Sequence, residues 1–191
     1  QGSYNWSQFD AQIQQAISNH QKFSFGIMSL CNGCDPGNGG VVLGGGTAYY
    51  PSYVHSAMQA ETNKDFLNNG DWIPNWNSNN YLSRWEALLN ALAQHLATGT
   101  YMGVKYSDAI NYVDVRGYGS WGEWHSGGIF DNMSQYPTGT RPTVATYERI
   151  IDSHITAFPD YHLDEGARGV TTWANGQVRG PRNACAHVEI S

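Results

Sequence analysis

The chain has few charged residues and no basic stripe. Asp, Glu, Lys and Arg make up 14% of the 191 residues, and the ten Lys and Arg leave a formal net charge of -6. A nucleic-acid-binding surface needs clustered positive charge to neutralise phosphates, and here the basic residues are scattered. We therefore expect no nucleic-acid partner.

Long apolar runs and several catalytic signatures are also missing. No stretch approaches the roughly 18 apolar residues that a membrane-spanning helix needs, so no membrane partner is expected. The glycine-rich segment 37–46, GNGGVVLGGG, lacks the lysine of a phosphate-binding loop. There is no G-x-S-x-G nucleophile elbow and no H-E-x-x-H zinc motif. We expect neither a metal nor another cofactor.

Cysteine is scarce, with three residues in the chain. Cys31 and Cys34 share a C-x-x-C spacing in LCNGCDPGNGG, which favours a small structural disulfide loop or free thiols. A zinc site or a redox pair is the alternative, but a zinc site would need two more ligands and there is no second C-x-x-C. Cys185 has no assigned role.

Aromatic residues and glycine are abundant instead, with 7 Trp, 12 Tyr and 22 Gly. Flat rings and short amides suit neutral, polyhydroxylated ligands, so a carbohydrate is the expected partner and a secreted or extracytoplasmic location is expected. The length fits one domain over residues 1–191. Because the chain begins at Gln1, we expect its start to be processed, trimmed or excised from a larger gene.

Hydrophobic periodicity predicts alternating helices and strands. Apolar residues at helical spacing and a possible Ser7 cap indicate a helix within 4–21, and a leucine-rich stripe indicates another over 81–98. The remaining expected elements are strands at 22–30 and 110–117, a helix at 143–160, and a long loop at 31–83 with a possible short helix at 52–60. This order indicates βα units, an α/β fold with a parallel sheet that forms a partial or reduced (β/α) TIM-type barrel. The tail at 161–191 has no predicted structure beyond one or two possible strands.

Residues 111–125, NYVDVRGYGSWGEWH, carry the main candidate site. Chemistry in parallel βα folds lies at the carboxyl ends of strands. Alternation places Val113 and Val115 beneath the helices, and Asp114 and Arg116 on the opposite face, where buried charges must pair. This pair is either a structural ion network or a device that orients a catalytic carboxylate.

Glu123 follows this strand and is the candidate catalytic carboxylate. Trp121 and Trp124 flank it, and three nearby glycines allow a sharp bend. Desolvation by the two indoles would raise the pKa of the acid, as a general acid working near neutral pH requires. The alternative is an ordinary polar loop residue.

Two segments together resemble a known enzyme clan. VDVRGYGSWGEWH resembles the fourth strand of retaining (β/α)8-barrel glycoside hydrolases, where a glutamate at the strand end is the acid/base. GSYNWSQFDAQIQQAISNHQKFSFGI is similar to the helix and third strand that precede it, and β-galactosidase-like barrels are the nearest in character. The resemblance covers about residues 2–160.

The resemblance implies an enzyme that hydrolyses β-linked polysaccharides or oligosaccharides, with Glu123 as acid/base. It also implies sugar subsites lined by Trp72, Trp76, Tyr118, Trp121, Trp124 and His125. The nucleophile of the clan has no evident counterpart, and the available carboxylates are Asp114, Asp131, Asp164, Glu165 and Glu189. Two alternatives stay open, a non-catalytic carbohydrate-binding domain and a barrel remnant that self-associates as a homo-oligomer through exposed strand edges.

Overall fold

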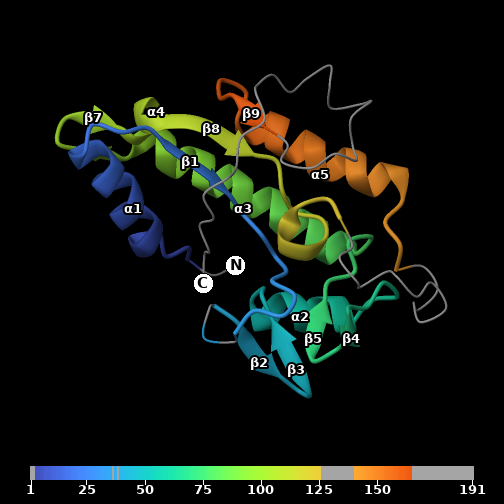
Figure 1. The fold of residues 1–191 in the computed structure, drawn as a ribbon. Coiled ribbons are helices and arrows are strands. Elements are labelled where there is room, and N and C mark those ends of the chain that lie inside the picture. Colours follow the sequence, from blue (N-terminus) through green and yellow to red (C-terminus); the bar gives the residue numbers. More distant parts are fainter. Residues whose placement is uncertain (1–2, 36, 38, 126–139, 165–191) are drawn as a thin grey trace.

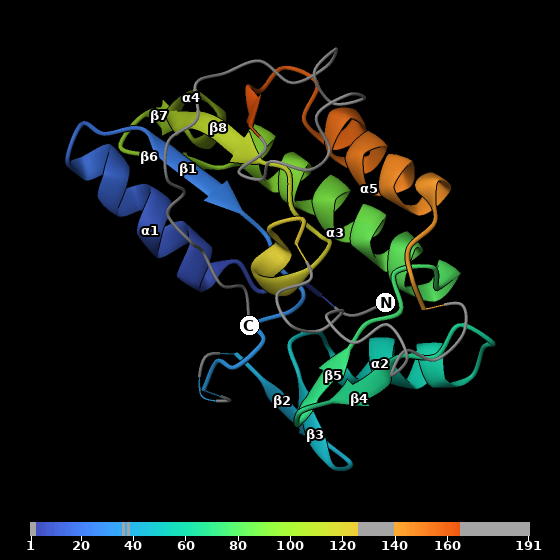
Figure 2. The same ribbon diagram turned by 45° about the vertical axis from the view of Figure 1, so that its right-hand side comes forward.

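The computed structural model describes residues 3–35, 37, 39–125 and 140–164 of the chain. It shows a mixed α/β fold with two main parts, a parallel sheet with long helices and a sheet of four short strands with a short helix, hereafter the small sheet (Figures 1 and 2). The elements of the first part are α1 (Ser7–Ser18), β1 (Phe23–Gly26), α3 (Asn79–Thr98), β8 (Ile110–Asp114), α5 (Val144–Ala157) and β9 (Leu163–Asp164). A hairpin of β6 (Thr100–Tyr101) and β7 (Val104–Lys105) and the short α4 (Tyr106–Ala109) connect α3 to β8.

The parallel sheet has the strand order β1-β8-β9. Gly26 pairs with Asp114, and Asp114 pairs with Asp164, so all three strands end at the same edge. The predicted α/β class and parallel sheet are confirmed. The described residues supply three parallel strands, and these do not close into a barrel. The two predicted strands are shorter than expected, because pairing stops where the chain turns into its loops.

The two faces of this sheet differ as the alternation predicts. Phe25 packs edge-on against Phe9 of α1, with ring centroids 5.1 Å apart, and against Phe158 after α5, at 6.1 Å. Val113 is the register partner of Phe25, so it lies on the same helix-covered face. Gly26 and Asp114 lie on the opposite face.

The prediction of a long loop at 31–83 is wrong for much of this segment. It contains β2 (Val41–Leu43), β3 (Gly46–Ala48), α2 (Ser52–Gln59), β4 (Phe66–Asn68) and β5 (Asp71–Ile73). The strands form a sheet of order β2-β3-β5-β4, while the possible helix at 52–60 is confirmed. Strands of three residues are too short to show a period of two in the sequence, which is why the pattern failed.

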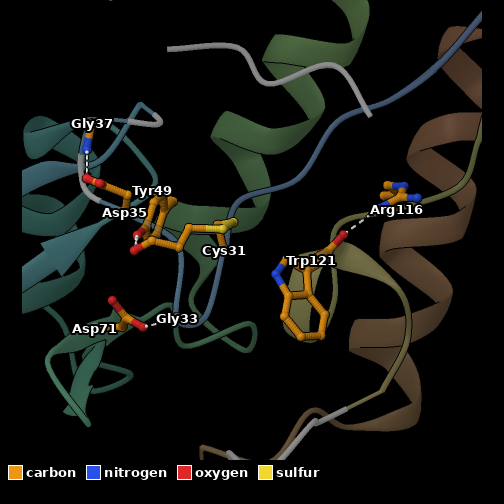
Figure 3. Close-up of a disulfide and its surroundings, with 9 residues drawn as sticks. Cys31, Gly33, Asp35, Gly37, Tyr49, Asp71, Arg116 and Trp121 are labelled. Carbon is orange, nitrogen blue, oxygen red and sulfur yellow. Dashed lines mark hydrogen bonds between the residues drawn. A yellow bond between two sulfur atoms is a disulfide. The ribbon is translucent and has the colours of Figure 1, made fainter. Parts of the chain in front are cut away.

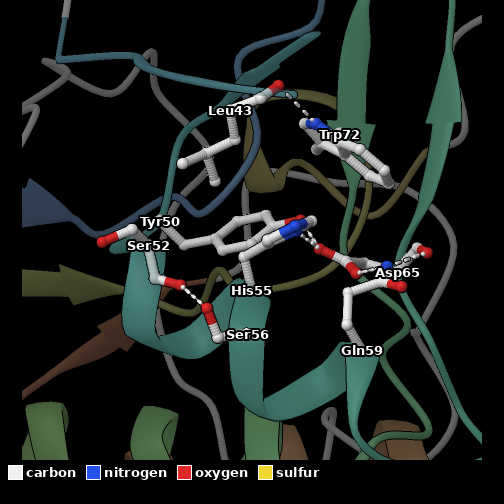
Figure 4. A network of polar contacts seen from close by, with 8 residues as sticks. All are labelled: Leu43, Tyr50, Ser52, His55, Ser56, Gln59, Asp65 and Trp72. Carbon is white, nitrogen blue, oxygen red and sulfur yellow. Dashed lines mark hydrogen bonds and ion pairs between the residues drawn. The ribbon is translucent and has the colours of Figure 1, made fainter. Parts of the chain in front are cut away.

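A buried carboxylate joins α2 to this small sheet (Figure 4). Asp65 is 3% exposed and accepts hydrogen bonds from Tyr50 Oη at 2.6 Å and from His55 Nδ1 at 2.7 Å. Gln59 Nε2 also donates to Asp65 Oδ1, at 2.5 Å. Burial and the neighbouring carboxylate raise the pKa of Tyr50, so its phenol stays protonated and donates.

Side chains cap the starts of α3 and α5, whereas the predicted cap of the first helix is wrong. Ser7 was expected to cap the first helix, but it is already its first residue, and its backbone N–H donates to Asn5 Oδ1 at 3.0 Å. Ser78 Oγ accepts from Tyr81 N at 3.0 Å to cap α3, and Thr143 Oγ1 caps α5. None of the helices in the described ranges is both long and apolar enough to cross a membrane.

Candidate functional site

The segment after β8 forms a tight loop at the carboxyl edge of the parallel sheet. It contains a 3-10 turn at Ser120–Gly122, and it closes through Ser120 N donating to His125 O at 2.9 Å and Trp124 N donating to Tyr118 O at 3.0 Å. Glu123 directly follows the 3-10 turn, and its N–H donates to Ser120 O at 3.0 Å. Glu123 therefore lies just beyond the strand end, as predicted.

Positive φ angles give this loop its sharp bend. Gly117, Gly119 and Gly122 all have them, as do Trp121 (53°) and Trp124 (60°). A side chain at Gly119 would place its Cβ 2.3 Å from the His125 carbonyl oxygen, so the close approach of the two loop arms requires glycine. Left-handed conformations are unfavourable for bulky residues such as tryptophan, so the surrounding contacts hold the loop in this shape.

Buried donors hold the base of the loop. The Gly117 carbonyl accepts from Trp76 Nε1 at 2.8 Å and from Tyr81 Oη at 3.0 Å. Trp124 Nε1 donates to the Val115 carbonyl at 2.5 Å. Burial raises the pKa of Tyr81, which keeps its phenol protonated as a donor. The position of Glu123 is thus set by the core of the protein.

Arg116 connects the sheet to the loop. Its side chain is 3% exposed, and its Nε donates to the Asp114 carboxylate. Nη1 donates to Trp121 O at 2.6 Å, and Nη2 lies 3.4 Å from Glu123 Oε1. A Cβ at Gly26 would stand 2.5 Å from Arg116 Nε, so the guanidinium lies directly over this glycine. The predicted pairing of Asp114 with Arg116 is confirmed, and the guanidinium reaches the candidate acid.

The surroundings of Glu123 are more polar than the sequence suggested. Its side chain is 35% exposed, and Oε2 lies 3.6 Å from His125 Nε2. Trp124 is buried with its indole turned to Val115, and Trp121 is 37% exposed. The expected enclosure of the acid between two indoles is therefore wrong. The Arg116 guanidinium and the His125 ring lie near the carboxylate, which is partly exposed.

The predicted sugar-binding aromatics divide into buried and accessible groups. Trp76 is 0% exposed, and it packs edge-on against Tyr118 at 4.9 Å. Tyr118 and Trp124 are buried with it, so direct stacking of these three rings on a sugar is ruled out in this conformation. Trp72 lies on β5, where Nε1 donates to Leu43 O at 3.0 Å, in the small sheet. Trp121 and His125 remain as exposed neighbours of Glu123.

A groove of about 440 Å³ opens near the end of β1, and the sequence reasoning did not find it. The groove lies between the segment before α1, the start of α2 and the first half of α3, and its aromatic lining includes Tyr4, Trp6, Tyr53 and Trp85. Met28 also lines it, and a Cβ on Gly122 would stand 3.3 Å from Met28 Cβ. The groove thus lies next to the Glu123 loop. Because its residues are far apart in the sequence, no single motif could reveal it.

Cys31 and Cys34 form a disulfide in the loop that follows β1 (Figure 3). Tyr49 Oη donates to Cys34 O at 2.9 Å, and Gly33 N donates to Asp71 Oδ2 at 3.1 Å, which ties this loop to the small sheet. The structural disulfide is therefore the correct alternative for the C-x-x-C pair. Cys185 lies outside the described residues.

Further carboxylates lie near the same edge of the sheet. Asp114 and Asp164 are register partners on adjacent strands and are 2% and 6% exposed. The other candidates, Asp131, Glu165 and Glu189, lie outside the described residues. Within the described ranges, no group of three or more His, Cys, Asp or Glu could hold a metal ion.

No protein-family model, curated protein or solved structure matches the chain.

Proposed function

We propose that this chain belongs to a glycoside hydrolase that cleaves β-linked polysaccharides or oligosaccharides, with Glu123 as the general acid/base. The observation that carries the proposal is the position of the Glu123 carboxylate. It lies beyond the carboxyl end of a parallel strand, is 35% exposed, and is 3.4 Å from a guanidinium that is itself 3% exposed. A buried group holds the acid in place while its carboxylate remains open to a ligand.

The order of the strands supports a (β/α) barrel-type architecture. In the described residues each successive parallel strand adds to the same side of the one before it, in the order β1-β8-β9, and α3 and α5 lie in the connections. Barrels continue in this direction throughout, and doubly wound sheets do so within each half, up to the switch point. We propose that the three strands are part of such a barrel, with Glu123 on its catalytic edge.

The proposed chemistry assigns a separate task to each neighbour of the acid. Glu123 gives its proton to the glycosidic oxygen as the bond to the anomeric carbon breaks, and it then takes a proton from the attacking water. Arg116 orients the carboxylate through Nη2 and holds the loop through Nη1. Trp121 and His125 are the exposed groups that contact the sugar. A retaining mechanism also needs a second carboxylate about 5 Å away.

The test compares two leaving groups in a Glu123→Gln variant. Turnover of β-linked oligosaccharides should fall about 100- to 10,000-fold, the usual contribution of general acid catalysis. For dinitrophenyl β-glycosides the rate of the glycosylation step should fall far less, because their leaving group departs without a proton. Glu148→Gln is the matched control, because Glu148 lies on α5 and outside the loop that contains Glu123. Equal losses for both leaving groups, or full turnover in Glu123→Gln, would end the proposal.

One observation favours a second candidate, a non-catalytic carbohydrate-binding domain. Arg116 contacts both Trp121 O and Glu123 Oε1, so Glu123 has a structural use as a brace for its own loop. In that case sugar binding, measured by calorimetry, would persist with no release of reducing ends. Glu123→Gln would then reduce the stability of the loop and change no rate. Concentration-dependent sedimentation would reveal self-association of a barrel remnant.

A further inference from the structure

Among the described residues that line the groove beside the Glu123 loop, Arg84 of α3 is the one with a charged side chain. The other lining groups are apolar, aromatic or neutral polar residues. An isolated cation in such a site is worth explaining, because a half-buried charge is stabilised by a partner of opposite sign.

Arg84 is held in place by neutral groups. Nη1 donates to Asn80 O at 2.9 Å and to Asn80 Oδ1 at 2.7 Å, and the guanidinium carbon lies 5.8 Å from the centre of the Tyr53 ring. In the described part of the chain, no carboxylate forms an ion pair with Arg84. A guanidinium has five N–H donors in a planar fork, so donors remain for a ligand.

Aromatic rings line the groove together with this cation. Tyr53 is 49% exposed and Tyr4 is 41% exposed. Tyr4 stacks on Trp6 with ring centroids 5.3 Å apart and an interplanar angle of 20°. Burial and the nearby phenol of Tyr53 raise the pKa of Tyr4, so its hydroxyl stays neutral and presents no negative charge to an anionic ligand in the groove. The rings offer faces for the C–H surface of a pyranose.

We propose that this groove binds a hexuronate, with its carboxylate on the Arg84 guanidinium and its pyranose ring against Tyr53. The pairing of a carboxylate with a guanidinium is bidentate and charge-assisted, which gives it a preference that neutral sugars lack. Met28 lines the groove, and a Cβ on Gly122 of the Glu123 loop would stand 3.3 Å from Met28 Cβ, so the groove lies next to this loop. The hexuronate is therefore a unit of the substrate, an assignment that rests on the proposed hydrolase function. The acidic sugar chain then extends from the groove toward Glu123.

The experiment compares two probes that differ at C6, methyl β-D-glucuronide and methyl β-D-glucoside. Both are titrated by NMR into the Glu123→Gln variant, which removes hydrolysis as a complication. We expect the glucuronide to bind about tenfold more tightly, the lower end for a hydrogen bond to a charged group, and the preference to shrink as salt is added.

Three further variants separate the contributions. Arg84→Gln keeps a polar side chain near Asn80 and should make the affinities of the two probes equal. Arg84→Lys should keep part of the preference for the glucuronide. Tyr53→Ala should weaken both probes together. Lys64→Gln removes a positive charge from an exposed position outside the groove and should change nothing.

Several outcomes would overturn the inference. These are equal affinities of the two probes for the Glu123→Gln protein, a preference that survives the addition of Arg84→Gln, shifts that map away from the groove, or no binding of either probe at millimolar concentration. If instead the glucuronide binds in the groove but Glu123→Gln leaves the turnover of oligosaccharides unchanged, the hydrolase assignment fails and the hexuronate site stands.

Discussion

His154 on α5 makes the stability of this protein sensitive to pH in a defined range. The residue is 1% exposed, and the centroid of its ring lies 5.9 Å from that of the Trp85 ring. Its Nδ1 donates to Ile150 O at 2.8 Å. Burial lowers the pKa of His154 from 6.5 to about 4, although the Ile150 carbonyl and the Asp114 carboxylate oppose the shift. The folded protein therefore keeps this histidine neutral at a pH where the unfolded chain protonates it.

The direction and the size of the pH effect on the free energy of unfolding follow from proton linkage. Between pH 6.5 and about 4 the unfolded state binds more protons, so the free energy of unfolding falls as the pH falls. Above pH 6.5 both states are neutral and the full contribution is present. At pH 5 the loss is about 2 kcal/mol, at 1.36 kcal/mol for each pKa unit.

Urea unfolding at pH 7 and pH 5 tests this value in the parent protein and in His154→Gln. The variant can be less stable at both pH values, so the quantity compared is the change between them. The parent should lose about 2 kcal/mol more than the variant, because the other histidines contribute equally to both. Equal losses in the two proteins would refute the reasoning that the buried ring stays neutral.

Two other substitutions test contacts that hold the site and the small sheet. Gly26→Ala would force a Cβ against the Arg116 guanidinium, so we expect a loss of about 1–3 kcal/mol in denaturant unfolding and weaker glycoside turnover; an unchanged stability would show that Arg116 does not lie over Gly26. Tyr50→Phe removes a donor from the buried Asp65 carboxylate and should cost about 2 kcal/mol in thermal unfolding, whereas a cost below about 0.5 kcal/mol would mean that Asp65 finds another donor.

Long periodic segments of the sequence predicted the main sheet and its helices well. The leucine stripe of α3 and the alternation of β8 are patterns that burial imposes over many residues, and both elements lie where they were expected. The sheet of β2, β3, β4 and β5 was missed because each strand has three residues. Its stability comes from tertiary contacts such as the Asp65 network, which no local pattern displays.

The candidate site was predicted in part for a related reason. Glu123 and the pairing of Asp114 with Arg116 follow from their position at a strand end, which alternation locates. The exposure of the aromatic rings does not follow, because a tryptophan in a loop can serve the core or the surface equally well. Trp76 and Trp124 are buried, and their indole N–H groups find partners in the backbone carbonyls of Gly117 and Val115.

The same buried indoles explain how an exposed acid is held firmly. The carbonyls of Val115 and Gly117, at the two ends of the turn out of β8, accept from Trp124 and Trp76. These bonds hold the loop from beneath, while Arg116 holds it from the sheet face. Proton transfer tolerates a displacement of the carboxylate of only a fraction of an ångström, and a loop with few core contacts would allow larger displacements. The indoles of Trp76 and Trp124 therefore contribute to the position of the Glu123 loop. Under the proposed function, Trp121 and the groove are left as the groups that would contact the sugar.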